Sequence, residues 1–420
     1  MKLRHHAHRR RLRGFGYLGR LGPGLVTGAS DDDPSGIGTY SQAGAALRFG
    51  MLWTAIVAFP LAGAVQEASA RLGLTTGKGL AALIKERFPR WVLFGAVLVV
   101  VTANVFNIGA DLGAMAASIH VLIPLPQVLL LAVITGLALG LEIFVPYHRY
   151  AKILRWLTLS LGAYIAVLFA IDVNWGQVAR HTFVPSLHRD RADLAVLIAI
   201  FGTTISPYLF FWQCSEEVEE ELEHEARGPV SPLQMKAMRV DVVSGMASAV
   251  AVMFAIMVSS SATLGAHGIT TVQTADQAAR ALRPIAGSVA GLLFALGIVG
   301  TGALAVPVLA GSTAYALAET FGWNEGLYRK LRDAHGFYGT IAVAMVAGMA
   351  MRALGVNPIR ALYFAAILNG LAAPPLILLI LLLSTSQRTM GRAKSGALSR
   401  VLLAIAFLVM AGLPVAYIVL

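Results

Sequence analysis

Charged residues and cysteine are both scarce in this 420-residue sequence. The single cysteine, Cys214, excludes an intramolecular disulfide framework. Charged residues make up only 13% of the chain, whereas 57% of it is hydrophobic and the mean hydropathy is +0.71. This is too little charge to cover the surface of a soluble multidomain protein. The composition therefore predicts an all-α chain that crosses a membrane many times.

Sequence patterns typical of enzymes and of nucleic-acid binders are missing as well. We find no Gly-rich phosphate loop, catalytic triad or zinc-ligand spacing, and we predict that the protein is not an enzyme. The net charge of +11 does not indicate a nucleic-acid partner, because the basic residues lie between apolar segments rather than on one soluble face. The lipid bilayer is the partner that this distribution predicts.

Residues 1–20 form a basic N-terminal segment that contains seven Lys and Arg. No long apolar region with a small-residue cleavage site follows it, so we do not predict a removable signal peptide. We interpret the segment as a disordered cytoplasmic tail. A metal-binding role for His5, His6 and His8 is the alternative.

Eleven apolar segments are long enough to cross a bilayer as helices. They lie at residues 22–46, 51–73, 91–119, 127–145, 151–171, 193–214, 240–264, 284–318, 338–356, 360–384 and 398–419. If the N-terminus is cytoplasmic, 25 of the 33 Lys and Arg fall on the cytoplasmic side and 8 on the outer side. By the positive-inside rule we predict a multi-pass protein of the cell membrane with its N-terminus inside and its C-terminus outside.

The first of these segments carries three consecutive carboxylates, Asp31, Asp32 and Asp33. A charge at the bilayer centre costs at least ~2.5 kcal/mol. Pro34 and Gly36 follow, and they favour a break in the helix. Broken membrane helices are tolerated only where the freed backbone groups line a cavity, so we predict a cation site at membrane depth. The alternative places the acids in a loop before a later helix, but residues 21–29 are too apolar to favour it.

The sixth segment contains a second interruption, in LIAIFGTTISPYLFFWQCS at residues 197–215. The two interruptions are five spans apart, so they lie in helices of opposite orientation. This is typical of an inverted repeat with the substrate between the breaks. We predict a transporter domain at 21–420, built from repeats 22–171 and 193–384 and an extra helix at 398–419. Helices one and six are predicted to unwind at 31–36 and 203–207.

Five stretches between Gly22 and residue 391 carry recognisable patterns. They are GPGLVTGASDDDPSGIGTYSQAGA, QEASARLGLTTGKGLAALIKERFPRW, NIGADLGAM, TTISP and TSQRTMG. In this order they resemble the first helix, the second helix with its following loop, the third helix, the sixth-helix break and the end of the tenth helix of Nramp divalent-metal transporters. In that family the first break reads DPGN, followed by an AGA element, and the sixth reads M-P-H-N.

The resemblance implies a LeuT-like fold of eleven or twelve helices that moves divalent transition metals together with protons. The metal is then the substrate, and no cofactor is expected. The family's ligand positions correspond to Asp33 and the Thr203 carbonyl, which are kept, and to Gly36 and Ser206, which replace Asn and Met. Tyr208 replaces a His. A family Glu in the third helix is Ala114 here.

The substitution of Ser206 for Met changes the expected selectivity. A thioether favours soft transition metals, whereas a site made of oxygen atoms suits Mg²⁺ and Ca²⁺. Gly36 and Ser206 are smaller than the residues they replace and leave room for a hydrated ion. Asp31 and Asp32 are predicted to hold outer-shell water or to line the entry. The pattern is similar to Nramp-related magnesium transporters.

Proton coupling is predicted to be weak or absent, because Tyr208 and Ala114 do not titrate near neutral pH. Asp111 remains as a carrier, or it is a buried acid hydrogen-bonded to Asn104 or Asn107. Four further polar positions have either a transport role or a role in interhelical hydrogen bonding: Gln66, Glu67, Glu142 and Asp241.

Residues 216–225 contain seven Glu in ten positions. This run is interpreted either as a solvated helix extension or as a funnel that attracts cations to the inner mouth. The predicted function is secondary transport of a divalent cation by a monomer. The alternative is an organic-cation transporter or a non-transporting sensor on the same fold, since a carboxylate at a helix break also binds ammonium groups.

Overall fold

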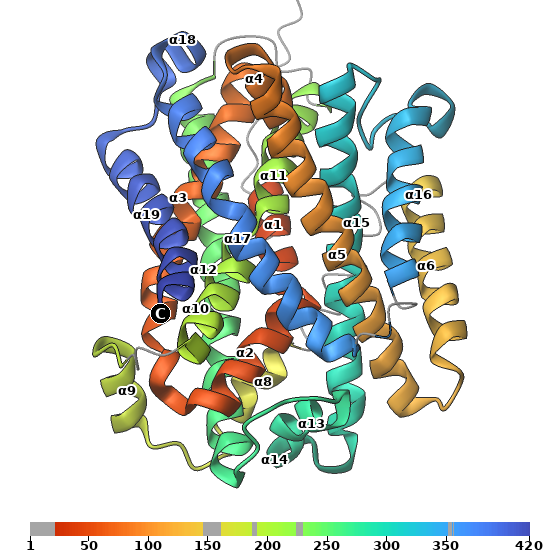
Figure 1. Cartoon of the computed structure of the whole chain (residues 1–420), viewed down its shortest axis with the longest axis vertical. Helices are drawn as coiled ribbons and strands as arrows, with labels where there is room; N and C mark the ends of the chain where they lie inside the picture. The colour runs from red at the N-terminus through yellow and green to blue at the C-terminus, as the bar shows by residue number, and fades with distance from the viewer. Residues whose placement is uncertain (1–21, 146–160, 187–190, 224–229, 352–354, 356) are drawn as a thin grey trace, which may run out of the picture.

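The computed structural model describes residues 22–145, 161–186, 191–223, 230–351, 355 and 357–420. In these ranges the chain forms helices and no strands, as Figure 1 shows. The predicted all-α class is confirmed.

The first half of the chain runs from α1 to α9. Its helices are α1 (Pro23–Asp31), α2 (Pro34–Leu47), α3 (Trp53–Thr76), α4 (Leu80–Arg87), α5 (Arg90–Leu122), α6 (Gln127–Phe144), α8 (Gly162–Val167) and α9 (Trp175–Phe183). A 3₁₀ turn at Arg48–Met51 follows α2, and the chain bends there by 111° into α3.

The second half runs from α10 to α19. Its helices are α10 (Arg191–Thr204), α11 (Pro207–Glu223), α12 (Pro232–Thr263), α13 (Ala275–Ala279), α14 (Arg283–Ala286), α15 (Ala290–Phe321), α16 (His335–Ala350), α17 (Pro358–Thr385), α18 (Gln387–Met390) and α19 (Ala397–Val419). In Figure 1, α4 and α18 lie at one end of the molecule, and α9, α13 and α14 lie at the other.

The number of membrane spans is only partly visible. Among the described residues, seven helical segments are long and apolar enough to cross a membrane, and the bent pair from Pro34 to Thr76 makes an eighth. The predicted fifth span, 151–171, is described only from residue 161 onward. In the predicted ninth span, α16 has 16 residues, which is short for a crossing. The multi-pass helical class is therefore confirmed, while the count of eleven and the repeat boundaries stay predictions.

Both predicted helix breaks are present and are shorter than predicted. α1 ends at Asp31 and α2 begins at Pro34, while α10 ends at Thr204 and α11 begins at Pro207. A proline at the first helical position has no N–H to leave unpaired, so each helix restarts directly at its proline. Helices one and six were predicted to unwind at 31–36 and 203–207. Within those ranges only residues 32–33 and 205–206 are not helical, because side chains cap the freed backbone groups, as described below.

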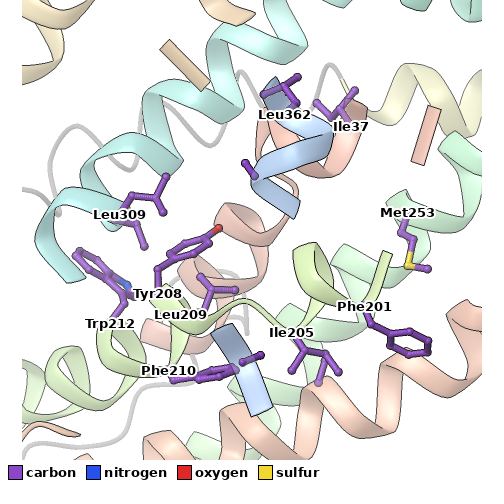
Figure 2. Packing of buried hydrophobic residues seen from close by; sticks show 14 of the residues in the cluster. Ile37, Phe201, Ile205, Tyr208, Leu209, Phe210, Trp212, Met253, Leu309 and Leu362 are labelled. Carbon is purple, nitrogen blue, oxygen red and sulfur yellow. The ribbon is translucent and has the colours of Figure 1, made fainter. Parts of the chain in front are cut away.

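Glycines allow backbones to touch where the half-helices pack. A Cβ atom on Gly24 of α1 would lie 2.6 Å from the Val242 nitrogen of α12. A Cβ atom on Gly370 of α17 would lie 2.6 Å from the Ile198 carbonyl oxygen of α10. Apolar side chains fill the space around the start of α11, where Figure 2 shows the Tyr208 hydroxyl turned toward the first broken helix. The two breaks are thus held in the middle of the helical bundle.

Candidate cation site

Asp33 lies at the first break and is 1% exposed. Its Oδ1 atom accepts hydrogen bonds of 2.7 Å from the Gly36 backbone N–H and from the Ser35 hydroxyl. Its Oδ2 atom is only loosely held, at 3.4 Å from both the Asn107 amide nitrogen and the Tyr208 hydroxyl. Asp33 therefore caps α2 with one oxygen and leaves the other able to bind a ligand.

Hydrogen bonds join α2 to α10 on one side of the breaks. The Ser35 and Thr203 hydroxyl oxygens are 3.2 Å apart, and the Tyr40 and Thr204 hydroxyl oxygens are 2.9 Å apart. All four side chains are buried. Because the contacts connect one break to the other, they close the site toward the end of the molecule where α9, α13 and α14 lie.

A second set of hydrogen bonds joins α1 to α11 on the other side. The Tyr208 hydroxyl donates to the Ser30 carbonyl oxygen at 2.8 Å, and the Thr27 hydroxyl donates to Gln213 Oε1 at 2.6 Å. These contacts close the site toward the end that carries α4 and α18. Asp33 is 1% exposed, and the side chains of Thr27 and Thr203 on its two sides are buried, so the site is shut off from the surface on both sides in this structure.

Thr203 and Ser206 lie together at the second break. The Ser206 hydroxyl donates to the Thr203 and Gly202 carbonyl oxygens, at 2.7 and 2.9 Å. The one hydroxyl proton is shared between two carbonyls that the end of α10 would otherwise leave unpaired. The lone pairs of the Ser206 oxygen and one lone pair of the Thr203 carbonyl remain available. Gly36 lies across the gap, since a Cβ atom there would be 3.5 Å from the Thr203 hydroxyl oxygen.

Asp111 does not make the hydrogen bonds predicted as one of its alternatives. Neither Asn104 nor Asn107 donates a hydrogen bond to the Asp111 carboxylate, although Asp111 is fully buried. Asn107 donates instead to Asp33, and Asn104 donates across to Leu309, Ser312 and Thr313 of α15. That alternative was wrong because both amides point away from their own helix toward neighbouring elements.

Further polar atoms around the breaks are buried without partners. They include one carboxylate oxygen each of Asp31 and Asp32 and the amide oxygen of Asn107. Asn369 of α17, which sequence reasoning missed, has neither amide atom paired and is 0% exposed. The one available signal was an isolated Asn in an otherwise apolar helix. Buried polar atoms are normally paired, so this group of unpartnered atoms indicates that a polar ligand or water belongs there.

The polar residues Gln66 and Glu67 of α3 and Glu142 of α6 have different environments. Glu67 pairs with Arg71 on its own helix and with Arg239 of α12, so it does make an interhelical contact. Gln66 is buried, and neither of its amide atoms has a partner. Glu142 is buried in α6.

Asp241 of α12 stabilises the start of α1. Its carboxylate accepts a 2.7 Å hydrogen bond from the Gly24 backbone N–H. Gly22, the residue that precedes α1, has no side chain to cap the helix. The cap is therefore supplied by another helix, and it attaches α1 to α12.

The Glu-rich run continues α11 as far as Glu223, and residues 224 and 225 lie outside the described part. The solvated interpretation was wrong for the best buried members of the run. Glu217 accepts a hydrogen bond from Gln213, and Glu219 accepts hydrogen bonds from Tyr315 and the Leu327 backbone. Both are buried: Glu219 anchors α11 to α15 and to the segment after it, while Glu217 is held by its own helix.

The donor set at the breaks is incomplete as a metal cage. Within the described ranges, no three His, Cys, Asp or Glu side chains are arranged to hold a metal ion. One well-placed carboxylate, neutral hydroxyls and carbonyls remain, and all of them are oxygen ligands. Such a set suits an ion that keeps part of its water shell and is released again.

The fold and this site define a class of protein: a multi-pass membrane protein in which two broken helices enclose a buried acidic site. The model of one family, the natural resistance-associated macrophage protein-like family (Nramp), matches residues 24–420. The chain belongs to this family.

Curated relatives and solved structures agree with this assignment. The chain is 27% identical over 380 residues to the divalent metal cation transporter MntH of Acidiphilium cryptum, covering 88% of this chain and 83% of the relative. It is 27% identical over 381 residues to MntH of Klebsiella pneumoniae strain 342, covering 89% and 87%.

Two solved structures share the fold. A crystal structure of the Eremococcus coleocola manganese transporter matches with a TM-score of 0.73 and 17% identity over 93% of this chain and 84% of that one. The inward-facing conformation of Mhp1 matches with a TM-score of 0.56 and 13% identity over 95% and 89%.

Proposed function

We propose that the protein is a secondary transporter that moves a divalent metal cation across the cell membrane, with the ion held between the two helix breaks. One observation carries the proposal: the loosely held Oδ2 atom of buried Asp33, surrounded by polar atoms that lack partners. The curated relatives named above are divalent metal cation transporters, which supports the same reaction for this chain.

Asp33 is proposed as the principal ligand, with the Thr203 carbonyl and the Ser206 hydroxyl opposite it. Ser206 already donates its proton to carbonyl oxygens, so its lone pairs are free to face a cation. The backbone at Gly36 leaves space beside them. Asp31, Asp32 and the Asn369 amide are proposed to hold water molecules of the ion's hydration shell, because each has a buried polar atom that lacks a partner.

The selectivity that we propose is for hard or weakly discriminated divalent ions, including Mg²⁺ and Ca²⁺. The ligands named above are all oxygen atoms, and none contributes the soft character that favours transition metals. A Mg²⁺ ion keeps most of its water shell and would need the neutral, small side chains that Gly36 and Ser206 supply.

Transport is proposed to be weakly coupled or uncoupled to protons. Tyr208, beside Asp33, is a phenol that donates to the Ser30 carbonyl and does not exchange its proton near neutral pH. Ala114 on α5 carries no titratable group. We further propose that the N-terminus is cytoplasmic and that the unit of transport is a monomer.

Uptake into proteoliposomes tests the function. Purified protein is reconstituted in liposomes loaded with a metal-sensitive dye and separately with a pH-sensitive dye, and Mn²⁺, Mg²⁺ or Ca²⁺ is added outside. We expect saturable metal entry without stoichiometric acidification. Metal-driven acidification would refute the uncoupled proposal and point to Asp33 or Asp111 as proton carrier. Absence of any divalent uptake by folded protein would refute metal transport and favour an organic cation or a sensor.

A further inference from the structure

A cavity lies away from the helix breaks, at the end of the molecule that carries α4 and α18. Its volume is about 350 Å³. Its lining includes Arg87 and Phe88 at the end of α4, Leu382 near the end of α17, and Ser386, Arg388 and Thr389 around α18. The last three belong to the TSQRTMG stretch, to which the proposed transport site assigns no role.

The lining carries positive charge that the protein does not neutralise. Within the described ranges, neither Arg87 nor Arg388 forms an ion pair with a carboxylate. Glu86 also lines the cavity, but it pairs with Lys78. The Arg87 guanidinium donates to the backbone carbonyl of Arg388, which connects the two sides of the cavity. Both arginines thus line the cavity with guanidinium groups that no described carboxylate pairs with, so they can bind an anion.

A hydroxyl group of the lining also lacks a partner. Thr389 Oγ1 is buried and makes no hydrogen bond. A buried hydroxyl without a partner is unfavourable, so a ligand with acceptor oxygens would stabilise this position. Arginine forks match the geometry of phosphate oxygens particularly well.

The cavity lies at the level where a membrane surface is expected. Large aromatic side chains are exposed at the same end of the molecule: Trp91 and Phe94 on α5, and Phe321 and Trp323 at the end of α15. Phe321 stacks on Trp323, with ring centroids 5.2 Å apart. Aromatic belts of this kind mark the headgroup region of a bilayer. Leu382, beside the cavity, is 46% exposed on the outer surface of α17.

We propose that this cavity binds the headgroup of an anionic phospholipid. The phosphate lies between the guanidinium groups of Arg87 and Arg388, Thr389 donates a further hydrogen bond, and an acyl chain runs along Leu382. A soluble phosphate compound shares the anionic chemistry. The lipid fits better, because Phe88 and Leu382 give the lining an apolar side and the aromatic belt lies at the same level.

Lipid titration tests the proposal. Purified full-length protein in detergent is titrated with dioctanoyl phosphatidylglycerol, dioctanoyl phosphatidylcholine or inorganic phosphate, and binding is followed by thermal unfolding and native mass spectrometry. We expect phosphatidylglycerol to bind and to raise the melting temperature, and the other two to have little effect. Arg388→Gln should weaken phosphatidylglycerol binding by about tenfold. This change leaves the backbone carbonyl that holds Arg87 in place.

Arg332→Gln is the matched control, because it removes an equally charged and highly exposed side chain from the same end of the molecule. It should bind the lipid as the wild type does. Thr389→Val, which keeps the size of the side chain, should weaken binding without unfolding the protein. Equal binding of phosphatidylcholine, or equal losses in Arg388→Gln and Arg332→Gln, would overturn the proposal. Inorganic phosphate that displaces the lipid at comparable concentration would instead assign the cavity to a soluble phosphate compound.

Discussion

Replacing Asp33 by Asn separates its structural role from its role as a ligand. Asn caps a helix about as well as Asp, so the bonds from Gly36 N and the Ser35 hydroxyl can persist and the fold should be kept. The change removes one negative charge and turns an amide group toward Asn107 and Tyr208. At an effective dielectric constant near 20, a pair of unit charges ~4 Å apart contributes about 4 kcal/mol.

We therefore expect Asp33→Asn to weaken divalent-cation binding by roughly a thousandfold, which corresponds to about 4 kcal/mol. For a dication the full Coulomb energy is larger, and water that replaces the lost ligand offsets part of it. Calorimetric titration with Mn²⁺, Mg²⁺ and Ca²⁺ measures the loss, and circular dichroism verifies the fold.

Two variants serve as comparisons for this experiment. Asp31→Asn should weaken binding only modestly, because Asp31 belongs to the turn before the break and is proposed to contact the ion through water. Asp276→Asn removes an exposed carboxylate paired with Arg280 and should change nothing. Wild-type affinity in Asp33→Asn, or equal losses in Asp31→Asn and Asp33→Asn, would refute the assignment of Asp33 as principal ligand.

Three further predictions concern other parts of the molecule. Ser206→Met should raise Mn²⁺ or Cd²⁺ affinity by roughly tenfold, about 1.4 kcal/mol, and lower that for Mg²⁺; titration showing unchanged selectivity would contradict the role of the hydroxyl. Burial and the nearby Glu319 and Glu219 raise the pKa of Glu325, in the loop after α15, to about 8 against an ordinary value of 4.5, with Arg329 opposing the shift. The stability that this protonated acid contributes is complete below about pH 4.5 and is lost as the pH rises to about 8. Glu325→Gln should therefore raise the melting temperature at pH 8 by about 1–2 °C and have little effect at pH 4.5; an equal effect at both values would contradict this. Asp241→Ala removes the cap of α1 and should cost about 1 kcal/mol of stability, measured by denaturation. It should also increase maleimide labelling of a cysteine introduced at position 27; unchanged labelling would show that the cap does not hold α1 against α12.

The fold could be predicted from features that act locally along the chain. Pro34 and Pro207 interrupt apolar segments beside polar residues, and each begins a new helix. Proline alone is not the signal, because Pro60, Pro307 and Pro414 lie inside α3, α15 and α19 without ending them. The lengths of the breaks were less predictable. They depend on the Asp33 carboxylate and the Ser206 hydroxyl folding back onto nearby backbone groups, which shortens each break to two residues.

The partners of polar side chains inside the bundle could not be predicted from the sequence. Asn104 and Asn107 lie one to two turns from Asp111, but the direction of each side chain depends on which helices pack against α5. Gln213 ends the apolar first half of α11, and Asn369 lies in an apolar stretch of α17. No local pattern shows that Gln213 has a partner across the bundle while Asn369 has none. The Glu-rich run appeared solvated because seven acids favour water, whereas Tyr315 and the Leu327 backbone bind Glu219.

The closure of the site by hydrogen bonds on both sides has a kinetic consequence. A cation reaches Asp33 only when the contacts near Thr203 or those near Thr27 have opened, so the rate of entry follows the population of the open state rather than diffusion. Weakening the Thr27 contact speeds both entry and escape, and these two changes largely cancel in the equilibrium constant. Rapid-mixing experiments, in which arrival and departure are timed separately, are therefore the measurement that reveals how strongly each side is closed.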